Sequence, residues 1–193
     1  LTLCLSLSFF FITSGCKKAL TEHPTSFVAP SNFFGTAAED EAAVNSIYSV
    51  LYNFFSDWQF LEETDGTSDL MWVNVSTSFD GTFSYNASAP GFGASVWNYG
   101  YRGVLYANNT IDGIEHSPID STAKKSMIAE AKFLRSLYYF FLTNTFNDVP
   151  YWSFPMNSED RVQQVSVLPR TNATTIRDSL IADLQGCAGD LPL

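Results

Sequence analysis

The sequence has only three cysteines among its 193 residues, which excludes a fold held together by many disulfides. Cys4 lies within an apolar leader and Cys16 directly follows it, so Cys187 is the one cysteine left in the body of the chain. A single thiol cannot form an intrachain disulfide. Stability must therefore come from packing, and a domain of this size can bury about 70% of the surface of its unfolded chain.

Positive charge is also scarce, because 10 lysines and arginines stand against 20 aspartates and glutamates, and the net charge is −10. No basic stripe is present, and proteins that bind nucleic acid need one to neutralise phosphates. We therefore expect no nucleic-acid partner. The two histidines, His23 and His116, have no second histidine or cysteine at metal-ligand spacing. The sequence predicts no metal site, no Cys–His pair and no cofactor.

Residues 1–12 are uncharged and nearly all apolar, and the small residues Thr13, Ser14 and Gly15 follow them directly before Cys16. This pattern is typical of a secretory signal peptide, and the run is shorter than the roughly 20 apolar residues of a membrane-spanning helix. We predict a signal peptide over residues 1–15. Cleavage would make Cys16 the first mature residue, and residues 13–16 resemble the lipobox at which bacterial lipoproteins are acylated.

The segment after the leader has no helical or alternating periodicity and contains Pro24, Pro30 and Gly35. We expect residues 16–35 to form a tether and residues 36–193 to form the folded domain. Thr36 and Glu39 form a capping-box pattern before a predicted helix over residues 38–57. Its expected core stripe consists of Val44, Ile47, Tyr48, Leu51, Tyr52 and Phe55.

Helical spacing returns after a long segment rich in glycine, serine, asparagine and aromatic residues, about 65–95. A second helix is predicted from Trp97 to about His116, and a third runs from a Thr122 cap to a left-handed Asn147. Two apolar stripes on the third helix place it at the centre; the second stripe consists of Phe133, Leu137 and Phe140. A loop through Arg170 and a fourth helix over 176–187 complete an all-α fold of helical hairpins.

The third helix carries the most distinctive motif, AEAKFLRSLYYFFLTNTFNDVPYW over residues 129–152. It resembles the diagnostic stretch of the SusD/RagB family, usually written EA-x-FLRA-x-YYF-x-L-x-x-x-FGDVPY. Further segments resemble the family in the same order, with Trp97, Tyr101 and Asn108 in one and Ile181, Asp183 and Leu184 in another. The resemblance covers nearly the whole chain and implies the N-terminal portion of a longer protein.

The resemblance implies tetratricopeptide-like helical hairpins with a long, irregular, loop-rich insertion. It also implies a lipoprotein on the outer face of the outer membrane that binds oligosaccharides, in some members peptides. The implied partner is a SusC-type TonB-dependent transporter, which receives the captured nutrient. The alternative is a helical scaffold lipoprotein that binds a protein or peptide and has no affinity for glycans.

Sugar capture requires flat aromatic rings and side chains that hydrogen-bond to hydroxyls. The segment 65–102 offers both, with Trp72 as the favoured stacking platform and Trp97 and Tyr101 more typical of packed residues. The candidate ligand-binding residues are Asp69, Trp72, Asn74, Tyr85, Phe92, Trp97, Asn98 and Arg102. The carboxylates Glu62, Glu63, Asp65 and Asp69 cluster in the same region, but such clusters are usually solvated, and we predict no enzyme.

Charged residues within the diagnostic motif are expected to have structural roles, because buried charges in proteins are paired. We expect Glu130 and Arg135 to be paired within or at the edge of the helix bundle. Asp148 is expected to act as a turn or cap residue. The residues of this predicted structural motif are Glu130, Phe133, Leu134, Arg135, Tyr138, Asp148 and Pro150.

Overall fold

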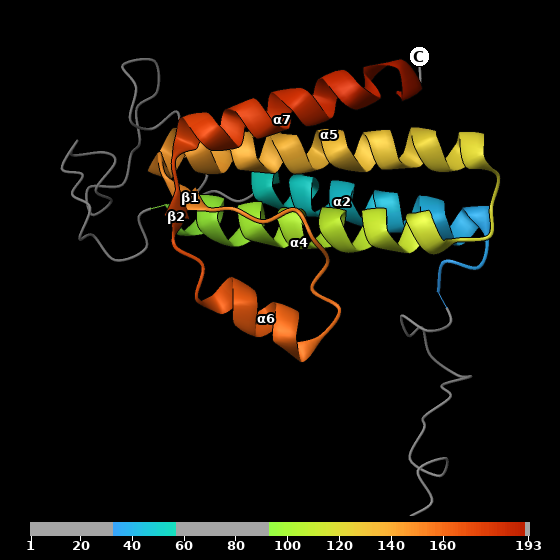
Figure 1. The fold of residues 1–193 in the computed structure, drawn as a ribbon, viewed down its shortest axis with the longest axis horizontal. Helices are drawn as coiled ribbons and strands as arrows, with labels where there is room; N and C mark the ends of the chain where they lie inside the picture. The colour runs from blue at the N-terminus through green and yellow to red at the C-terminus, as the bar shows by residue number, and fades with distance from the viewer. Residues whose placement is uncertain (1–32, 57–92, 192–193) are drawn as a thin grey trace, which may run out of the picture. The chain divides into compact units, whose positions relative to one another are not determined.

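Four long helices lie side by side in the computed structural model (Figure 1), which describes residues 33–56 and 93–191. The predicted signal peptide and nearly all of the predicted tether lie outside these ranges, so both stay predictions. The long helices are α2 (Ala37–Ser56), α4 (Ala94–His116), α5 (Ser121–Phe146) and α7 (Ala173–Cys187). Within residues 33–56 and 93–191, no helix combines the length and apolar character needed to span a bilayer.

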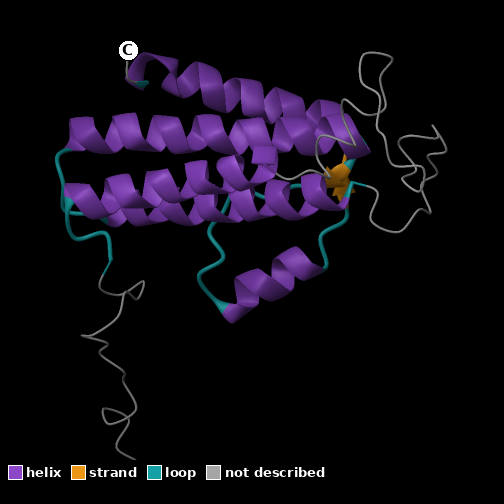
Figure 2. Cartoon of the chain, turned by 180° about the vertical axis from the view of Figure 1, so that it is seen from behind, coloured by secondary structure: helices purple, strands orange, loops and turns teal. Residues whose placement is uncertain are grey.

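Helix α5 is the centre of this arrangement, because it packs against α4, α2 and α7, while α2 also packs against α4. The link between α4 and α5 is only four residues long, so the two helices form an antiparallel hairpin. Figure 2 shows the almost entirely helical character of the described residues. The predicted all-α fold of helical hairpins is therefore confirmed.

The start of α2 confirms the predicted capping box. The backbone N–H of Glu39 donates to the Thr36 hydroxyl over 3.3 Å. In return, the Glu39 carboxylate accepts hydrogen bonds from the Thr36 hydroxyl at 3.0 Å and from the Gly35 N–H at 2.9 Å. These bonds pair backbone donors that a helix N-terminus otherwise leaves unsatisfied, so the sequence fixes where α2 begins.

The predicted cap of α5 was wrong. Asp120, not Thr122, is the N-cap, since its carboxylate accepts the backbone N–H groups of Thr122 at 2.8 Å and Ala123 at 3.3 Å. Aspartate is as good an N-cap as threonine, and its position sets the start of α5 at Ser121. At the other end Asn147 has a positive φ of 61°, but its ψ of −105° lies outside the left-handed helical region that was predicted.

The predicted core stripe of α2 was partly wrong. Val44 and Ile47 are buried, but Tyr48, Tyr52 and Phe55 are 40%, 74% and 47% exposed. The side of α2 that packs against its neighbours is a different stripe. It consists of Asp40, Ala43, Val44, Ile47, Val50 and Phe54. Both stripes have helical spacing, so periodicity alone could not choose between them.

The second predicted stripe of α5 was also wrong, because Phe133 is 44% exposed and Phe140 is 53% exposed. The buried stripe consists of Ala131, Leu134, Arg135, Tyr138, Tyr139 and Leu142. Helix α5 is central in the bundle, yet one of its sides stays open. That open side lies next to α7.

The segment between α5 and α7 is not the simple loop that was predicted. Strands β1 (Val149–Pro150) and β2 (Arg170–Thr171) pair in antiparallel register, with Val149 opposite Thr171. Between them lies α6 (Glu159–Ser166), which has no buried residue. The 3-10 helix η3 (Ala188–Asp190) then follows α7. Neither the two-residue strands nor the polar α6 has the apolar periodicity by which an element is recognised.

Candidate functional site

The N-terminal half of α4 carries all the predicted ligand-binding residues that the structure describes: Trp97, Asn98 and Arg102. All three are exposed, and Trp97 is 37% exposed. Trp97 and Tyr101 stand one turn apart on α4, and Asn98 and Arg102 stand one turn apart on the adjoining stripe. The helix therefore presents an indole, an amide and a guanidinium on its exposed side.

Trp97 is only partly the packed residue that its spacing suggested. Its ring meets Tyr101 and Phe146 edge-on, with centroid distances of 4.7 and 5.2 Å, while a third of the residue stays exposed. Edge-to-face contacts hold a ring in a fixed orientation and leave part of its surface open. A held and partly open indole ring is the kind of surface on which a pyranose stacks.

Two stacked aromatic rings, Tyr101 and Trp152, form an aromatic base next to Trp97. The Tyr101 ring stacks on Trp152 at 5.1 Å and 7°, and its hydroxyl donates to the Pro150 carbonyl oxygen at 2.9 Å. Burial raises the pKa of the Tyr101 hydroxyl, which further favours the protonated form that donates this hydrogen bond. These contacts connect α4 to β1, the strand that follows α5.

Arg102 is held over the Tyr99 ring, with its guanidinium carbon 5.4 Å from the ring centroid. This cation–π contact orients the side chain, while the exposed guanidinium keeps donors for a ligand. The remaining predicted ligand residues lie outside the described residues: Asp69, Trp72, Asn74, Tyr85 and Phe92. The carboxylate cluster of Glu62, Glu63, Asp65 and Asp69 lies outside them as well. The structure thus places three of the eight candidates on the exposed side of α4.

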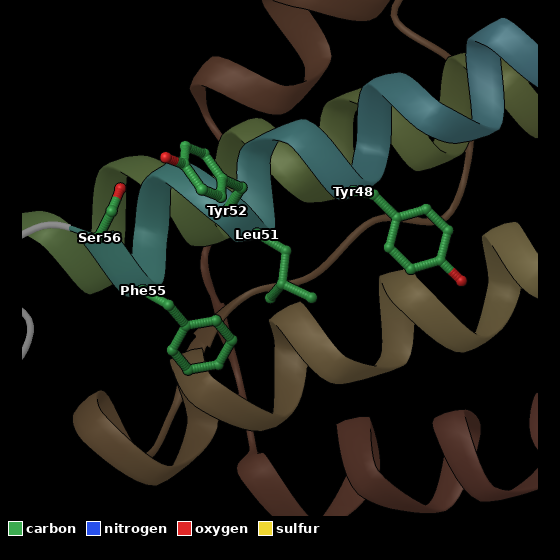
Figure 3. Close-up of a pocket in the computed structure, with 5 residues that line it drawn as sticks. All are labelled: Tyr48, Leu51, Tyr52, Phe55 and Ser56. Atoms are coloured by element: carbon green, nitrogen blue, oxygen red, sulfur yellow. The ribbon is translucent and has the colours of Figure 1, made fainter.

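A second feature, missed by sequence reasoning, is a hollow of about 390 Å³ on α2, lined by Tyr48, Leu51, Tyr52, Phe55 and Ser56. Leu51 and Phe55 point from α2 toward α5, and Tyr52 points away from it (Figure 3). The Tyr48 hydroxyl donates to the Glu130 carboxylate at 2.6 Å. Burial, followed by this carboxylate, raises the pKa of Tyr48 to about 12. The aromatic residues that line this hollow have helical spacing, so the sequence predicted them to be core residues.

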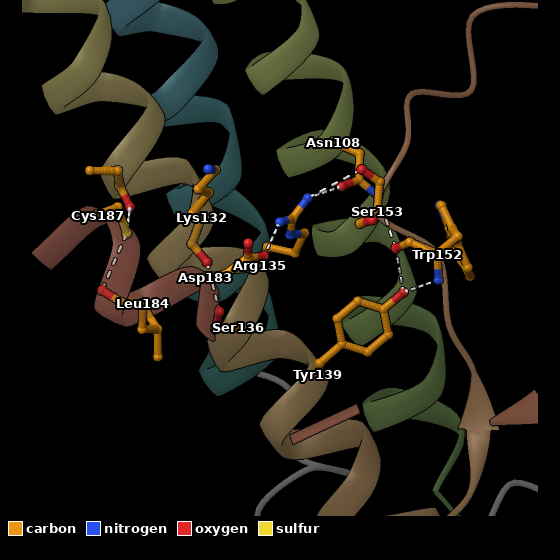
Figure 4. A network of polar contacts seen from close by, with 11 residues as sticks. Asn108, Lys132, Arg135, Ser136, Tyr139, Trp152, Ser153, Asp183, Leu184 and Cys187 are labelled. Atoms are coloured by element: carbon orange, nitrogen blue, oxygen red, sulfur yellow. Dashed lines mark hydrogen bonds and ion pairs between the residues drawn. The ribbon is translucent and has the colours of Figure 1, made fainter. Parts of the chain in front are cut away.

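The polar centre of the diagnostic motif is Arg135, which is 4% exposed (Figure 4). Its guanidinium donates to Asn108 of α4 at 2.7 Å and to the Ser153 carbonyl oxygen at 3.4 Å, and it pairs with Asp183 of α7. Nearby, the Tyr139 hydroxyl bonds both the N–H and the carbonyl oxygen of Trp152 at 2.9 Å. One arginine therefore connects α4, α7 and the segment after β1 to α5.

The other motif residues contact backbone or neighbouring helices. The Tyr138 hydroxyl donates to the Ile47 carbonyl oxygen at 2.7 Å, which links α5 to α2. Asp148 accepts the Ala173 N–H at 3.0 Å, so it caps α7 from a distance in sequence. Leu134 is buried, whereas Phe133 is exposed. The polar groups of Tyr138 and Asp148 therefore link and cap helices.

Among the described residues, no group of three or more histidine, cysteine or acidic side chains could hold a metal ion. The free thiol of Cys187 is buried beside the Ala129 carbonyl oxygen. Burial raises the pKa of this thiol, which disfavours the reactive thiolate. Its surroundings are those of a packed residue.

Residues 28–192 match a family described as SusD-like, starch-binding and associating with the outer membrane. Two SusD-like proteins of Formosa agariphila are similar, at 28% and 25% identity over 91% and 92% of this chain. The chain spans only about a third of the length of these relatives, 35% in each case.

Solved structures of similar fold belong to the same group. A laminarin-binding SusD-like protein aligns with a TM-score of 0.68 and 23% identity, over 82% of this chain and 35% of that one. A SusD-like protein from Bacteroides fragilis gives a TM-score of 0.68 and 22% identity, over 89% and 32%. A structure solved with a xylogluco-oligosaccharide gives 0.64 and 21%, over 79% and 30%. At these identities the likeness establishes the fold.

Proposed function

Because the chain belongs to the SusD-like family, we propose that it is the N-terminal part of a surface lipoprotein that binds oligosaccharides without cleaving them. The family match over residues 28–192 carries this proposal. The bound oligosaccharide would be delivered to a SusC-type TonB-dependent transporter. Residues 1–15 would be the signal peptide, 16–35 the lipid-anchored tether and 36–193 the first part of the helical body.

The chemistry of the α4 surface supports a glycan ligand. Trp97 offers an apolar ring face to the C–H side of a pyranose, and Asn98 and Arg102 can hydrogen-bond to its hydroxyls. Two structures of similar fold are described as laminarin-binding and as solved with a xylogluco-oligosaccharide. The ligand of this protein would then be a neutral glucan or a glycan of similar shape. Trp72 and the other candidates between residues 69 and 92 would complete the site.

Affinity gel electrophoresis of the full-length protein with laminarin, xyloglucan and starch tests this proposal. We expect at least one polysaccharide to retard the protein, and Trp97→Ala and Trp72→Ala to reduce the retardation. Tyr106→Ala is the matched control, because Tyr106 is on the same helix and is 39% exposed, against 37% for Trp97. If the Trp97 and Tyr106 variants migrate alike, the α4 surface does not bind the glycan. No retardation by any glycan would favour the peptide-binding alternative.

Anchoring of the protein is tested separately from ligand binding. Acyl chains on Cys16 would hold it at the membrane, since each buried CH₂ contributes about 0.8 kcal/mol. Metabolic labelling with an alkyne fatty acid should mark the wild type and the Cys187→Ser control, but not Cys16→Ser. Equal labelling of Cys16→Ser would contradict acylation at this residue.

Partnership with a transporter is tested by mild detergent extraction and affinity purification of the tagged, full-length protein from its own cells. We expect a large outer-membrane barrel protein to copurify in near-stoichiometric amount. Recovery of the protein alone under conditions that preserve other outer-membrane complexes would contradict the delivery step. Glycan affinity could still stand, since it is measured on the purified protein.

A further inference from the structure

The arginines of this acidic chain differ in how their guanidinium groups are engaged. Three of them donate hydrogen bonds to other groups of the protein: Arg135, Arg161 and Arg177. Arg102 and Arg170 are both exposed, and within residues 33–56 and 93–191 neither has a hydrogen bond or an ion pair. These two side chains therefore keep all their donors for a group outside this part of the chain.

Arg170 lies beside the aromatic base next to Trp97. It belongs to β2, where it stands opposite Pro150 of β1. The Pro150 carbonyl oxygen accepts the Tyr101 hydroxyl at 2.9 Å, and the Tyr101 ring meets Trp97 at 4.7 Å. Burial raises the pKa of Tyr101 and the charge of Arg170 acts against this rise, so the guanidinium is near enough to influence the hydroxyl. The hairpin thus brings a cation to the ring that contacts Trp97.

Arg102 brings a second cation to the same end of α4. It follows Tyr101 directly in the chain and shares the exposed side of the helix with Asn98. Its guanidinium carbon is 5.4 Å from the centroid of the Tyr99 ring, which orients the side chain without using its donors. Since the net charge of the chain is −10, two unpaired cations beside a candidate sugar platform indicate a ligand that supplies the negative charge.

The chemistry of the guanidinium group indicates which negative groups fit. A neutral sugar presents only hydroxyls, for which an amide such as that of Asn98 is sufficient. A guanidinium is a planar fork of donors that matches the paired oxygens of an anion, and hydrogen bonds between ionised groups are stronger than neutral ones. A pyranose that carries a carboxylate or a sulfate ester keeps its ring, so it could still stack on Trp97.

We infer that Arg170 and Arg102 bind the acidic groups of an anionic oligosaccharide whose sugar rings stack on Trp97. This inference rests on the proposed glycan binding. It narrows the ligand to a glycan that carries uronate carboxylates or sulfate esters. It also gives a ligand-binding role to Arg170, which sequence reasoning had placed only at the end of a loop.

Isothermal titration of the full-length protein with matched ligands tests the inference. Oligogalacturonate and its methyl ester have the same backbone and differ in charge. Sulfated laminarin and laminarin form a second such pair, so the two pairs distinguish a carboxylate from a sulfate ligand. We expect the acidic member of at least one pair to bind about tenfold more tightly than its neutral partner, because hydrogen bonds to charged groups are the stronger ones.

Variants then assign this preference to the two arginines. Arg170→Gln and Arg102→Gln should each weaken binding of the acidic member about tenfold. Binding of the neutral member should change much less, since glutamine still donates hydrogen bonds. Lys125→Gln is the control, because Lys125 is also exposed but lies in the first turns of α5. This control removes the same charge and should leave both affinities unchanged.

Equal affinity of the wild type for the acidic and neutral members of both pairs would overturn the inference and leave the proposed glycan binding intact. A preference for the acidic member that survives in both arginine variants would also overturn it. So would an equal loss in Lys125→Gln, because net charge alone would then explain the preference. Binding of no glycan, neutral or acidic, would contradict the proposed function itself.

Discussion

The interior around Arg135 and the groove between α5 and α7 lie on the same helices, yet their side chains differ in how completely they are buried. Around Arg135, two of the guanidinium nitrogens find partners on α4, α7 and the segment after β1. On the same helix, Phe133 and Phe140 border an open groove. The difference indicates that the described residues enclose Arg135, although its Nε has no partner among them, whereas they leave the groove side chains exposed.

Helix α2 also has a buried and an exposed side. Substitutions of aromatic residues on these two sides should differ most in their effect on stability. Phe54 is fully buried, and Tyr52 is 74% exposed. We expect Phe54→Ala to cost about 4 kcal/mol in the free energy of unfolding, through lost burial and a residual cavity. Tyr52→Ala should cost less than about 0.5 kcal/mol. Urea denaturation measures both, and equal losses would refute the assignment of the buried stripe.

Removal of the Arg135 side chain should produce the next largest effect. Arg135→Ala leaves Asp183 without its ion pair and Asn108 without its donor, and we expect a loss of about 3 kcal/mol in unfolding free energy. Arg161→Ala is the control, because Arg161 is exposed on α6 and its side chain contacts the Phe154 ring and Gln164. If the control loses as much stability as Arg135→Ala, the buried network contributes no more to stability than an exposed arginine does.

An added methyl group should be tolerated less well where α4 approaches α5 than near the end of α7. A Cβ at Gly103 would collide with the buried Tyr138 ring, whereas a Cβ at Gly186 would meet nothing within 4 Å. We expect Gly103→Ala to cost about 2 kcal/mol by overpacking, and Gly186→Ala to stabilise α7 by up to about 1 kcal/mol. Thermal unfolding should shift in opposite directions. A shift in the same direction would contradict the packing of these helices.

The smallest expected effect is at the exposed cap of α5. Hydrogen bonds from Thr122 and Ala123 lower the pKa of the Asp120 carboxyl. A lowered pKa in the folded state means that this stabilisation is complete above the ordinary aspartate pKa and is lost as pH falls through the lowered value. Asp120→Asn should keep the cap but remove this pH dependence, and Asp120→Ala should remove both. Unchanged melting of Asp120→Ala at neutral pH would contradict the cap.

Much of this fold follows from sequence, because the long helices carry apolar residues at helical spacing and α2 begins at a capping box. The sequence could not give α6, since that helix buries nothing. Nor could it choose between the two stripes of α2, since Phe54 and Phe55 both have apolar or aromatic neighbours at helical spacing. That choice is made by tertiary packing against α4 and α5.

The candidate site shows the same limit. Asn108, Arg135 and Asp183 stand in three separate motif segments, and only the folded chain brings them into one network. Trp97, Asn98 and Arg102 could be placed on one helix from their spacing alone, and their exposure came from the structure. The stripe of α5 that contains Phe133 and Phe140 was predicted to be buried. An apolar side chain indicates burial, but the sequence does not identify the partner that would cover it.

The central claim is that the full-length protein binds an oligosaccharide and leaves it intact. Isothermal titration with laminarin and xyloglucan oligosaccharides, followed by chromatography of the recovered sugar, tests both parts together. The account predicts saturable binding of at least one oligosaccharide and recovery of the ligand at its original length. Absence of binding to every glycan tried, or recovery of shortened products, would contradict it.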